Sequence, residues 1–451
     1  MRASADHLVD TQRGFVDRKI FVDRDLYEQE LEQIFGRCWL MIGHESQIPK
    51  PNDFAANYMG EDPILVTRDS KGKIHAFLNM CRHRGNRICR ADAGNAQSFM
   101  CTYHGWTFAT DGKLVGVPGY KEAYFEELDR SQWGLVEVAQ IDSYKGLLFA
   151  TWDRGAPSLP DYLADIGWYL DLHLDRRDGG TELVGGILKW NLTANWKFPA
   201  DNFAGDNYHA PITHGSINLT GSLADIRPAK APVPFGGGGY GGARSYSVHA
   251  GNGHGVISFG LNAAEAGRSA PRAVNVPEVI RNYYEEHADE LRQRLGPLRA
   301  GNVLPKILTV FPNFSTHLRS QLRVYHPRGP EKTEMWVYCL VDKEAPPHVK
   351  DAMHSNLTLT FGPSGTLDQD DMNNWIQCTA SGKGHIGKKY LMNLQLGLGH
   401  DGYSEMIPGE IGTNPGETPQ RHYYARWAEF MDAPSWRDVS LSPITYKTKT
   451  K

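Results

Sequence analysis

The sequence is poor in cysteine, in net charge and in long apolar runs. Only 6 of its 451 residues are cysteine, which excludes a small scaffold held by disulfides and leaves metal ligation or burial for these thiols. Basic and acidic residues nearly cancel, 48 against 52, so no positive field is available for nucleic acid or an anionic membrane. No apolar run approaches the ~18 residues of a membrane-spanning helix, and the first thirty residues lack an apolar signal segment. These absences predict a soluble, cytoplasmic protein.

The order of local patterns predicts an α+β chain of two or three domains. Residues 25–36 have the spacing of an amphipathic helix that begins with a capping box of Asp25 and Glu28. Short β-type runs separated by turn residues fill about 39–152, and a proline-containing break at 153–160 marks a domain boundary. Beyond the break the chain mixes extended runs with helical ones and shows no regular βαβ alternation. The runs are 189–198 and 308–326, expected to be extended, and 276–295 and 419–431, expected to be helical.

Two short loops each combine a cysteine with a histidine. The first reads C-R-H-R-G from Cys81 and contains His83, and the second reads C-T-Y-H-G-W from Cys101 and contains His104. Thiolates are soft donors that hold iron with bridging sulfide, and neutral imidazoles on the second iron raise the reduction potential. The spacing therefore predicts a Rieske [2Fe-2S] cluster, with Cys81 and Cys101 on one iron and His83 and His104 on the other.

A structural Cys2His2 zinc site is the alternative that the same ligand types allow. The remaining cysteines fit neither pair and have no partner motif near them, so we expect buried thiols. They are Cys38, Cys89, Cys339 and Cys378.

A second constellation lies in the segment NWKFPADNFAGDNYHAPITH, which ends at His214. Asn202, Asp206 and His209 fall at helical spacing and would share one face. His209 and His214 are five residues apart, about 140° around an ideal helix, so one metal can bind both only if the helix is broken. Pro211 would supply that break. Two imidazoles with a carboxylate from elsewhere in the chain would form the facial triad of a non-haem iron site. Ordinary packing is the alternative for two histidines near a kink.

With both constellations in view, the chain resembles the alpha subunits, the terminal oxygenases, of bacterial Rieske non-haem iron aromatic-ring-hydroxylating dioxygenases. The resemblance runs over nearly the whole length and includes TVFPNFS at 309–315 and FGPSGTLDQDDMNNW at 361–375. It implies a small all-β Rieske domain at 39–157, inserted into a catalytic domain with a curved antiparallel sheet covered by helices. Residues 1–38 and 158–451 would form that catalytic domain.

The resemblance also implies roles for single residues. The carboxylate ligand of the mononuclear iron would be Asp371, whose neighbour Asp370 is easily mistaken for it, although both could be first-turn helix acids. Asp206 would bridge His209 to His104 of a neighbouring subunit, with Asn202 beside it in the catalytic machinery. Phe203 and Asn207 would line the substrate pocket. The chain departs from many relatives in having Asp201 where they have Glu.

The implied activity uses O2 and two electrons to cis-dihydroxylate an aromatic ring, giving a cis-dihydrodiol, with a [2Fe-2S] cluster and mononuclear Fe(II) as cofactors. An apolar or polycyclic arene is the expected substrate. The implied partners are a small beta subunit, in a complex of three alpha and three beta subunits, a ferredoxin and an NADH-dependent reductase. The only G-x-G-x-x-G match, Gly236–Gly241, lacks the flanking strand and helix of a dinucleotide site, so NADH oxidation is expected on a separate protein.

Three alternatives stay open. A Rieske monooxygenase or demethylase would use the same metals. A dioxygenase acting on an aromatic carboxylate could bind it through Arg227, Lys230 or Arg244. An electron carrier or a zinc protein would not be an oxygenase at all. The glycine-rich stretch 235–255 is expected to be a loop.

Overall fold

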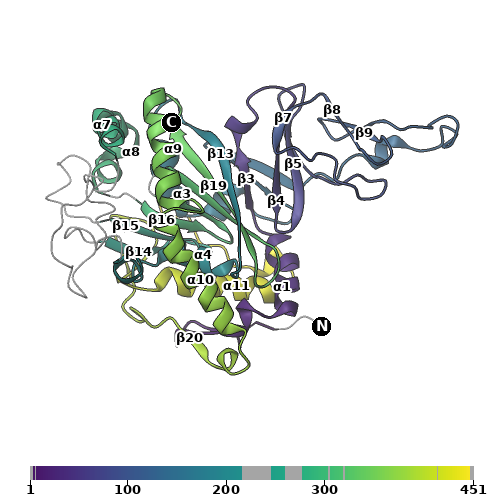
Figure 1. Cartoon of the computed structure of the whole chain (residues 1–451). Helices are drawn as coiled ribbons and strands as arrows, with labels where there is room; N and C mark the ends of the chain where they lie inside the picture. Colours follow the sequence, from purple (N-terminus) through teal and green to yellow (C-terminus); the bar gives the residue numbers. More distant parts are fainter. Residues whose placement is uncertain are drawn as a thin grey trace. The chain divides into compact units, whose positions relative to one another are not determined.

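The computed structural model describes residues 4–5, 7–215, 245–259, 277–302, 305–317, 320–413 and 415–446. It contains two compact units (Figure 1). Phe35–Leu159 is the smaller unit, and Met1–Ile34 joins Pro160–Lys451 in the larger one. The chain therefore leaves the larger unit after Ile34 and returns to it at Pro160. Among the described helices, none has the length and apolar character needed to cross a membrane.

The smaller unit consists of short antiparallel strands in three sheets. One sheet has the order β11 (Gln140–Tyr144), β12 (Leu147–Thr151), β3 (Leu40–His44). The second has the order β6 (Ile74–Leu78), β5 (Asp62–Arg68), β4 (Asp53–Met59), β7 (Ala93–Asn95). The third has the order β10 (Leu114–Gly116), β9 (Thr107–Ala109), β8 (Ser98–Met100).

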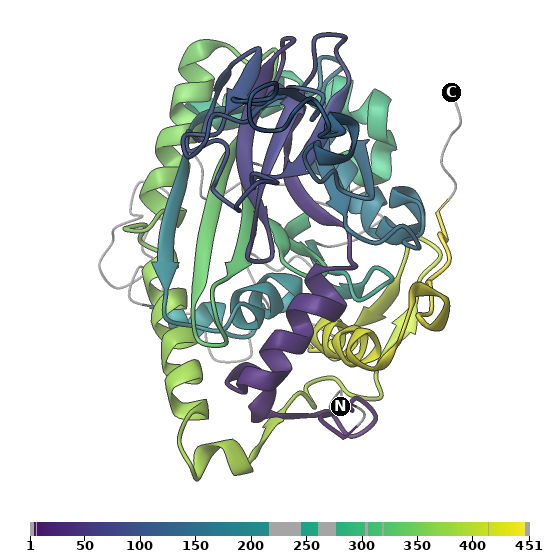
Figure 2. The same ribbon diagram turned by 90° about the vertical axis from the view of Figure 1, so that its right-hand side faces the viewer.

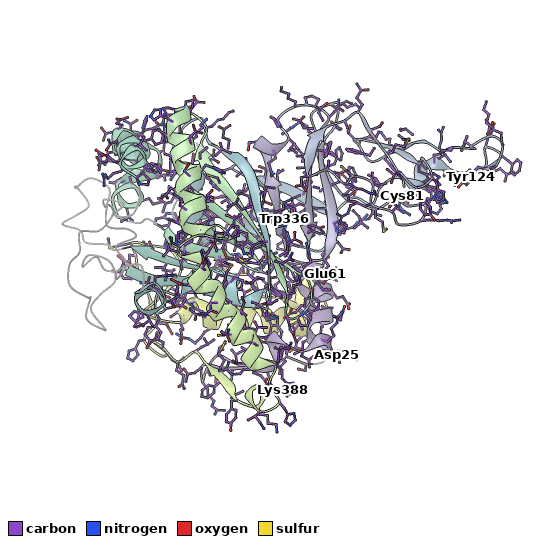
Figure 3. All side chains as sticks on the ribbon, viewed as in Figure 1. Asp25, Glu61, Cys81, Tyr124, Trp336 and Lys388 are labelled. Atoms are coloured by element: carbon purple, nitrogen blue, oxygen red, sulfur yellow. The ribbon has the colours of Figure 1, made fainter. Side chains whose placement is uncertain are left out.

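The two cysteine-bearing loops belong to the core of this unit. The first follows β6 and the second connects β8 to β9. Cys81 and Cys101 are buried in one apolar cluster with Phe77, Trp106 and Phe108, and Figure 3 shows the position of Cys81 among the side chains of the unit. The apolar residues of the short strands therefore form a frame around the two loops.

A nine-stranded antiparallel sheet is the centre of the larger unit. Every residue of its strands β17 and β18 is buried, and since successive side chains point to opposite faces, both faces are covered there. In order, the strands are β13 (Thr181–Leu192), β19 (Thr333–Asp342), β18 (Gln321–Pro327), β17 (Phe314–His317), β16 (Pro305–Val310), β15 (Gly255–Phe259), β14 (Ser245–His249), β22 (Glu410–Gly412) and β21 (Gly402–Tyr403). A small sheet joins β1 (Val9–Asp10), β2 (Phe15–Asp17) and β20 (Leu391–Asn393).

Helices cover this sheet. Helix α4 packs against β15, β16 and β17, helix α11 against α4 and β14, and helix α9 against β13 and β19. The described α-helices are α1 (Arg24–Glu30), α2 (Leu159–Leu163), α3 (Ile166–Leu174), α4 (Lys197–Gly205), α5 (Ala210–Thr213), α7 (Glu278–Glu286), α8 (Ala288–Asn302), α9 (Pro347–Phe361), α10 (Asp368–Gly382) and α11 (Thr418–Asp432). The α+β prediction is confirmed.

A buried charged pair connects three of these helices. Glu30 at the end of α1 forms an ion pair with Lys197 at the start of α4, and both side chains are almost fully buried. The indole N–H groups of Trp196 and Trp427 donate hydrogen bonds to the Glu30 carboxylate, at 2.8 and 2.7 Å. In Figure 2, α1 in purple lies beside α11 in yellow. Helix α1 is therefore built into the core of the larger unit.

Four local predictions were wrong. One is the burial of Cys378, whose side chain is exposed on α10. The first helix is capped by Asp23, two residues before the Asp25 of the predicted capping box, because Asp23 accepts hydrogen bonds from the backbone of Asp25 and Leu26. The helical run 276–295 is two helices, α7 and α8, which separate at His287. The extended run 189–198 is a strand only to Leu192 and then enters α4. Residues 235–244 of the glycine-rich stretch, which include Gly236–Gly241, lie outside the described residues, as do Arg227, Lys230 and Arg244.

Candidate metal centres

The two cysteine loops share one backbone turn. In each loop the amide of a glycine donates a hydrogen bond to the carbonyl of the cysteine four residues earlier, Gly85 to Cys81 and Gly105 to Cys101, both at 2.9 Å. The two glycines have φ angles of 76° and 74°, a region that glycine adopts without strain. The turns bring the rings of His83 and His104 together, with centroids 4.5 Å apart.

The surroundings of the loops favour the ligand forms of His83 and Cys101, whereas burial raises the pKa of the Cys81 thiol. Burial, followed by the nearby charge of His104, lowers the pKa of His83, so its imidazole is neutral, as metal binding requires. Its Nδ1 atom is buried and makes no hydrogen bond with any described residue. Burial would raise the pKa of Cys101, but hydrogen bonds from the backbone and from Asn86 lower it. Two buried cysteines beside two imidazoles are the donor set of a Rieske cluster.

The second constellation depends on a break between two helices, which lies earlier than Pro211. Helix α4 ends at Gly205, and Asp206 has extended backbone angles. The short helix α5 then begins after His209 and contains Pro211 in its first turn, where the missing N–H has no intrahelical partner to lose. The prediction that Pro211 breaks the helix was therefore wrong. The turn from Asp206 to His209 makes the break.

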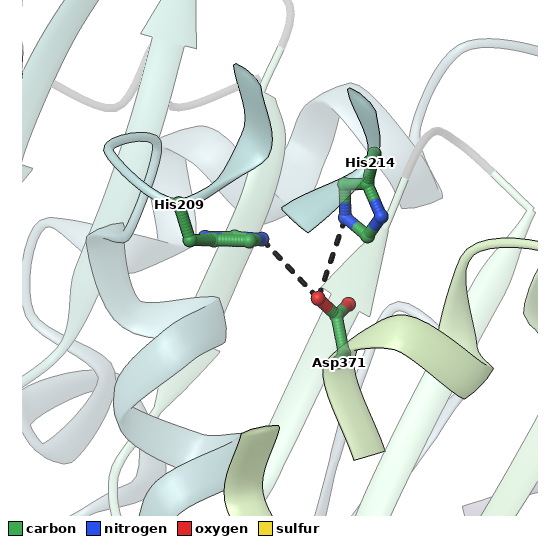
Figure 4. Close-up of side chains that lie close together, drawn as sticks. All are labelled: His209, His214 and Asp371. Carbon is green, nitrogen blue, oxygen red and sulfur yellow. Dashed lines mark ion pairs between the residues drawn. The ribbon is translucent and has the colours of Figure 1, made fainter. Parts of the chain in front are cut away.

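His209, His214 and Asp371 meet at one point (Figure 4). The Oδ1 atom of Asp371, from the first turn of α10, lies 3.3 Å from Nε2 of His209 and 3.3 Å from Nε2 of His214. The two rings are 5.4 Å apart and steeply inclined, at 76°. The Nε2 atoms of both imidazoles thus converge on the same carboxylate oxygen. Two neutral imidazoles and one carboxylate with this convergence fit a facial triad for iron.

The charges of His209 and Asp371 show which positive charge a bound cation would replace at this site. Burial opposes a charge on His209, but Asp206 and Asp371 overcome it and raise the pKa of the imidazole to about 10. Burial likewise opposes ionisation of Asp371, yet hydrogen bonds from His209 and His214 hold its pKa far below the usual range. In the metal-free protein, a proton on His209 therefore balances the buried carboxylate. A divalent cation would take over that role.

Asp206 has two functions in the break between α4 and α5. Its Oδ1 accepts hydrogen bonds from the backbone of Tyr208 and His209, at 2.9 and 3.1 Å, so it caps the turn. Its Oδ2 lies 3.2 Å from Nδ1 of His209 and 3.4 Å from Nδ2 of Asn202. A carboxylate on Nδ1 keeps the proton there and leaves Nε2 for a metal. The structure thus brings Asp206 and Asn202 to the outer side of His209.

The other aspartates of this region have different partners. Asp370 lies 3.5 Å from Nδ1 of His214, the ring nitrogen that faces away from Asp371. Asp368 forms a fully buried ion pair with Arg323. Asp201 accepts a hydrogen bond of 3.0 Å from the Tyr424 hydroxyl, and burial raises its pKa well above the usual value. None of these three carboxylates shares the point at which both Nε2 atoms meet.

Phe203 lies among aromatic and cationic side chains. It is buried on α4, 5.7 Å from the His317 ring and 4.5 Å from the guanidinium of Arg323. Phe361 in turn lies 4.1 Å from His317. Asn207 is in the turn before His209, partly buried. The structure thus places Phe203 next to Asn202 on α4 and Asn207 two residues before His209.

A second group with two histidines and a carboxylate was missed from the sequence. His249 on β14 and Glu410 on β22 are cross-strand partners, and His422 of α11 lies 2.9 Å from the Glu410 carboxylate. The two rings are stacked in parallel, with centroids 3.8 Å apart and planes at 4°. No local spacing signals this group, since the pairing of β14 with β22 joins residues 161 positions apart in number.

Two family profiles together match most of the chain. The Rieske [2Fe-2S] domain matches residues 38–141, and the ring hydroxylating alpha subunit (catalytic domain) matches residues 161–433. The predicted [2Fe-2S] cluster is thereby confirmed and the zinc alternative is set aside. The second profile belongs to a domain that carries mononuclear iron.

Similar proteins span nearly the full length. The biphenyl dioxygenase subunit alpha of Paraburkholderia xenovorans is 40% identical, with 97% of this chain and 94% of that protein covered. The benzene 1,2-dioxygenase subunit alpha of Pseudomonas putida is 38% identical, with 96% and 95% covered. A naphthalene 1,2-dioxygenase solved with indole in its active site superposes with a TM-score of 0.86 at 33% identity, with 97% and 96% covered.

Proposed function

The chain belongs to the alpha subunits of the Rieske aromatic-ring-hydroxylating dioxygenases, and from that premise we propose that it cis-dihydroxylates an apolar arene. The observation that carries the proposal is the convergence of His209, His214 and Asp371 on one point. Two imidazoles and a carboxylate leave coordination positions open on iron, as oxygen chemistry requires.

The residues of the two metal centres would have different roles in the reaction. When bound, the cluster passes electrons one at a time and the ferrous ion activates O2. The Nε2 atoms of His209 and His214 and the carboxylate of Asp371 would hold the iron. Asp206 holds the proton on Nδ1 of His209 and so fixes the tautomer that presents Nε2. Asn202 positions the Asp206 carboxylate through its amide.

We extend the proposal to the assembly. The relatives are named as alpha subunits, so a small beta subunit, a ferredoxin and an NADH-dependent reductase are the expected partners, in a complex of three alpha and three beta subunits. In such a ring Asp206 would connect His209 to His104 of the partner subunit. A carboxylate suits this position because it can accept a hydrogen bond from an imidazole on each side.

The proposed substrate class follows from the side chains near Phe203 and from the relatives. Phe203 and Phe361 are buried aromatic residues of the larger unit, and the similar proteins are named for biphenyl, benzene and naphthalene. Arenes without a charged substituent are therefore proposed over aromatic carboxylates.

Turnover of a substrate panel under 18O2 would test this proposal. Purified protein with its electron-transfer partners would be given biphenyl, naphthalene, benzoate and phthalate. We expect a cis-dihydrodiol with two labelled oxygen atoms from biphenyl or naphthalene. Incorporation of one labelled atom would identify a monooxygenase, and turnover of only benzoate or phthalate would refute the proposed substrate class.

A further inference from the structure

The two histidines of the cluster loops have different aromatic neighbours. His104 is covered by Tyr103, whose ring lies 3.8 Å away and which is 58% exposed. His83 instead stacks on Trp106, at 5.1 Å with planes inclined by 10°. The aromatic contacts of the two imidazoles therefore extend away from the loops in separate directions, through Tyr103 from His104 and through Trp106 from His83.

The route from His83 reaches the surface of the smaller unit through a second tryptophan. Trp106 is buried and meets Trp133 edge to face, with centroids 6.1 Å apart. Trp133 is 36% exposed, and the guanidinium of Arg82 lies 5.4 Å from its ring. Because electron tunnelling slows steeply with distance, a packed series of conjugated rings is a favourable path between a surface and a buried cluster.

A cavity of about 560 Å³ opens beside Arg82, and its lining contains two arginines and one tryptophan. It is lined by Arg82, Arg154, Trp152 and Glu137, among others. Arg154 is exposed and forms no ion pair with a described residue. The indole nitrogen of Trp152 is buried and has no hydrogen-bond partner in the described part of the chain. The carboxylate of Glu137 is already held by His75 at 2.7 Å.

The sequence around the first loop strengthens the positive character. Residues 82–90 contain four arginines and no acidic residue, and three of these arginines, Arg84, Arg87 and Arg90, are exposed. The arginines and the buried indole N–H of Trp152 are suited to bind a carboxylate. A partner protein with several carboxylates on its surface would form ion pairs with several of these arginines.

We propose that this surface, formed by Arg82, Trp133, Trp152 and Arg154, is the docking site of an acidic one-electron carrier protein. The inference rests on the proposed function, which requires such a carrier. One electron leaves the reduced carrier, which becomes oxidised, and passes by way of Trp133, Trp106 and His83 to the oxidised [2Fe-2S] cluster, which becomes reduced. The His104 side stays free for the outgoing electron.

Cluster reduction measured without any arene would test the proposal. A plant-type [2Fe-2S] ferredoxin, reduced beforehand, is the probe, because its potential lies below the Rieske range. Stopped-flow absorbance would follow the cluster in the wild type, Arg154→Glu, Trp133→Leu and Trp133→Phe. Lys50→Glu is the matched control, since it reverses an exposed charge on another turn of the same unit. Dithionite, a small reductant that needs no docking, would be used in parallel.

We expect Arg154→Glu to slow reduction by ferredoxin at least tenfold at low salt, with a smaller effect at high salt. Trp133→Leu should also slow it, and Trp133→Phe should restore much of the rate. Lys50→Glu should stay within about twofold of the wild type, and dithionite should reduce all variants alike. Equal ferredoxin rates for Arg154→Glu and Lys50→Glu would overturn the docking site. Equal rates for Trp133→Leu and the wild type would overturn the path. Both results are independent of arene turnover, so they are separate from a failure of the proposed function.

Discussion

The larger unit contains two groups with the same three donors, two imidazoles and a carboxylate, in different arrangements. In the first, the rings of His209 and His214 are inclined by 76° and their Nε2 atoms point at one oxygen of Asp371. In the second, the rings of His249 and His422 are parallel and stacked. A metal lies in the plane of an imidazole that binds it, so two stacked parallel rings cannot both bind one ion without rotating.

The difference teaches that donor type alone does not define a metal site. The first group comes from a helix break and the start of α10, where each side chain approaches from its own direction. The second comes from neighbouring strands and a helix packed on them, and the sheet keeps His249 and Glu410 side by side. We therefore expect the first group to hold iron and the second to act as an ion-paired stack within the fold.

Replacing Asp371 with Ala should have the largest effect. Among the described residues, the variant loses the only carboxylate oxygen that both Nε2 atoms share, so we expect mononuclear iron to be absent and product formation undetectable. The [2Fe-2S] cluster should stay intact, because its ligands are in the other unit. Iron analysis, acid-labile sulfide and the visible spectrum would measure these quantities. If iron and activity persist in Asp371→Ala but vanish in Asp370→Ala, the assignment moves to Asp370.

Replacing Asp206 with Ala should leave the cluster and the mononuclear iron in place yet stop electron transfer between them. We expect a normal cluster and most of the mononuclear iron, with product formation lowered at least a hundredfold, because the proposed link to His104 of the partner subunit is gone. Single-turnover reoxidation of the dithionite-reduced cluster in the presence of substrate and O2 would measure this loss of electron transfer. If Asp206 only caps the turn, its loss costs about 0.5–2 kcal/mol of stability and reoxidation stays normal.

Acid should lower the free energy of unfolding through protonation of His249, which stacks on His422. Burial lowers the pKa of His249 to about 4, whereas the unfolded chain titrates near 6.5. Between these values the unfolded state binds more protons, so the free energy of unfolding falls as the pH drops from 6.5 towards 4. Urea unfolding would measure how far the free energy of unfolding falls between pH 7 and pH 5. We expect this fall to be roughly 2 kcal/mol smaller in His249→Gln than in the wild type. Equal losses in both proteins would contradict the assignment of a neutral, buried His249.

Replacing Glu410 with Gln should have the smallest effect and separates the two groups most directly. The amide keeps the size of the side chain but loses the carboxylate charge beside the two rings, so we expect a loss of about 1 kcal/mol in the free energy of unfolding. Iron content and activity should match the wild type. A fall of one iron per chain would mean that this group, too, binds metal.

The sequence predicted local features better than distant ones. The spacing of Cys81 with His83 and of Cys101 with His104 indicated the cluster, because each loop holds its ligands within four residues. Asp371 lies far along the chain from His214, so no spacing could select it and only the resemblance did. The pairing of His249 with Glu410 depends on sheet register and left no trace in the sequence. The helix break was placed at Pro211 because the capping of the turn by Asp206 went unrecognised.

The ion pair of Glu30 with Lys197 has a consequence for the order in which the protein is made. A ribosome adds about 5–20 residues per second. Trp427, which donates to Glu30, therefore emerges some 20–80 s after the glutamate. During that interval the smaller unit can fold, while the first helix waits without its partners. The larger unit can close only near the end of synthesis, and a chaperone that shields the first helix would act in that interval.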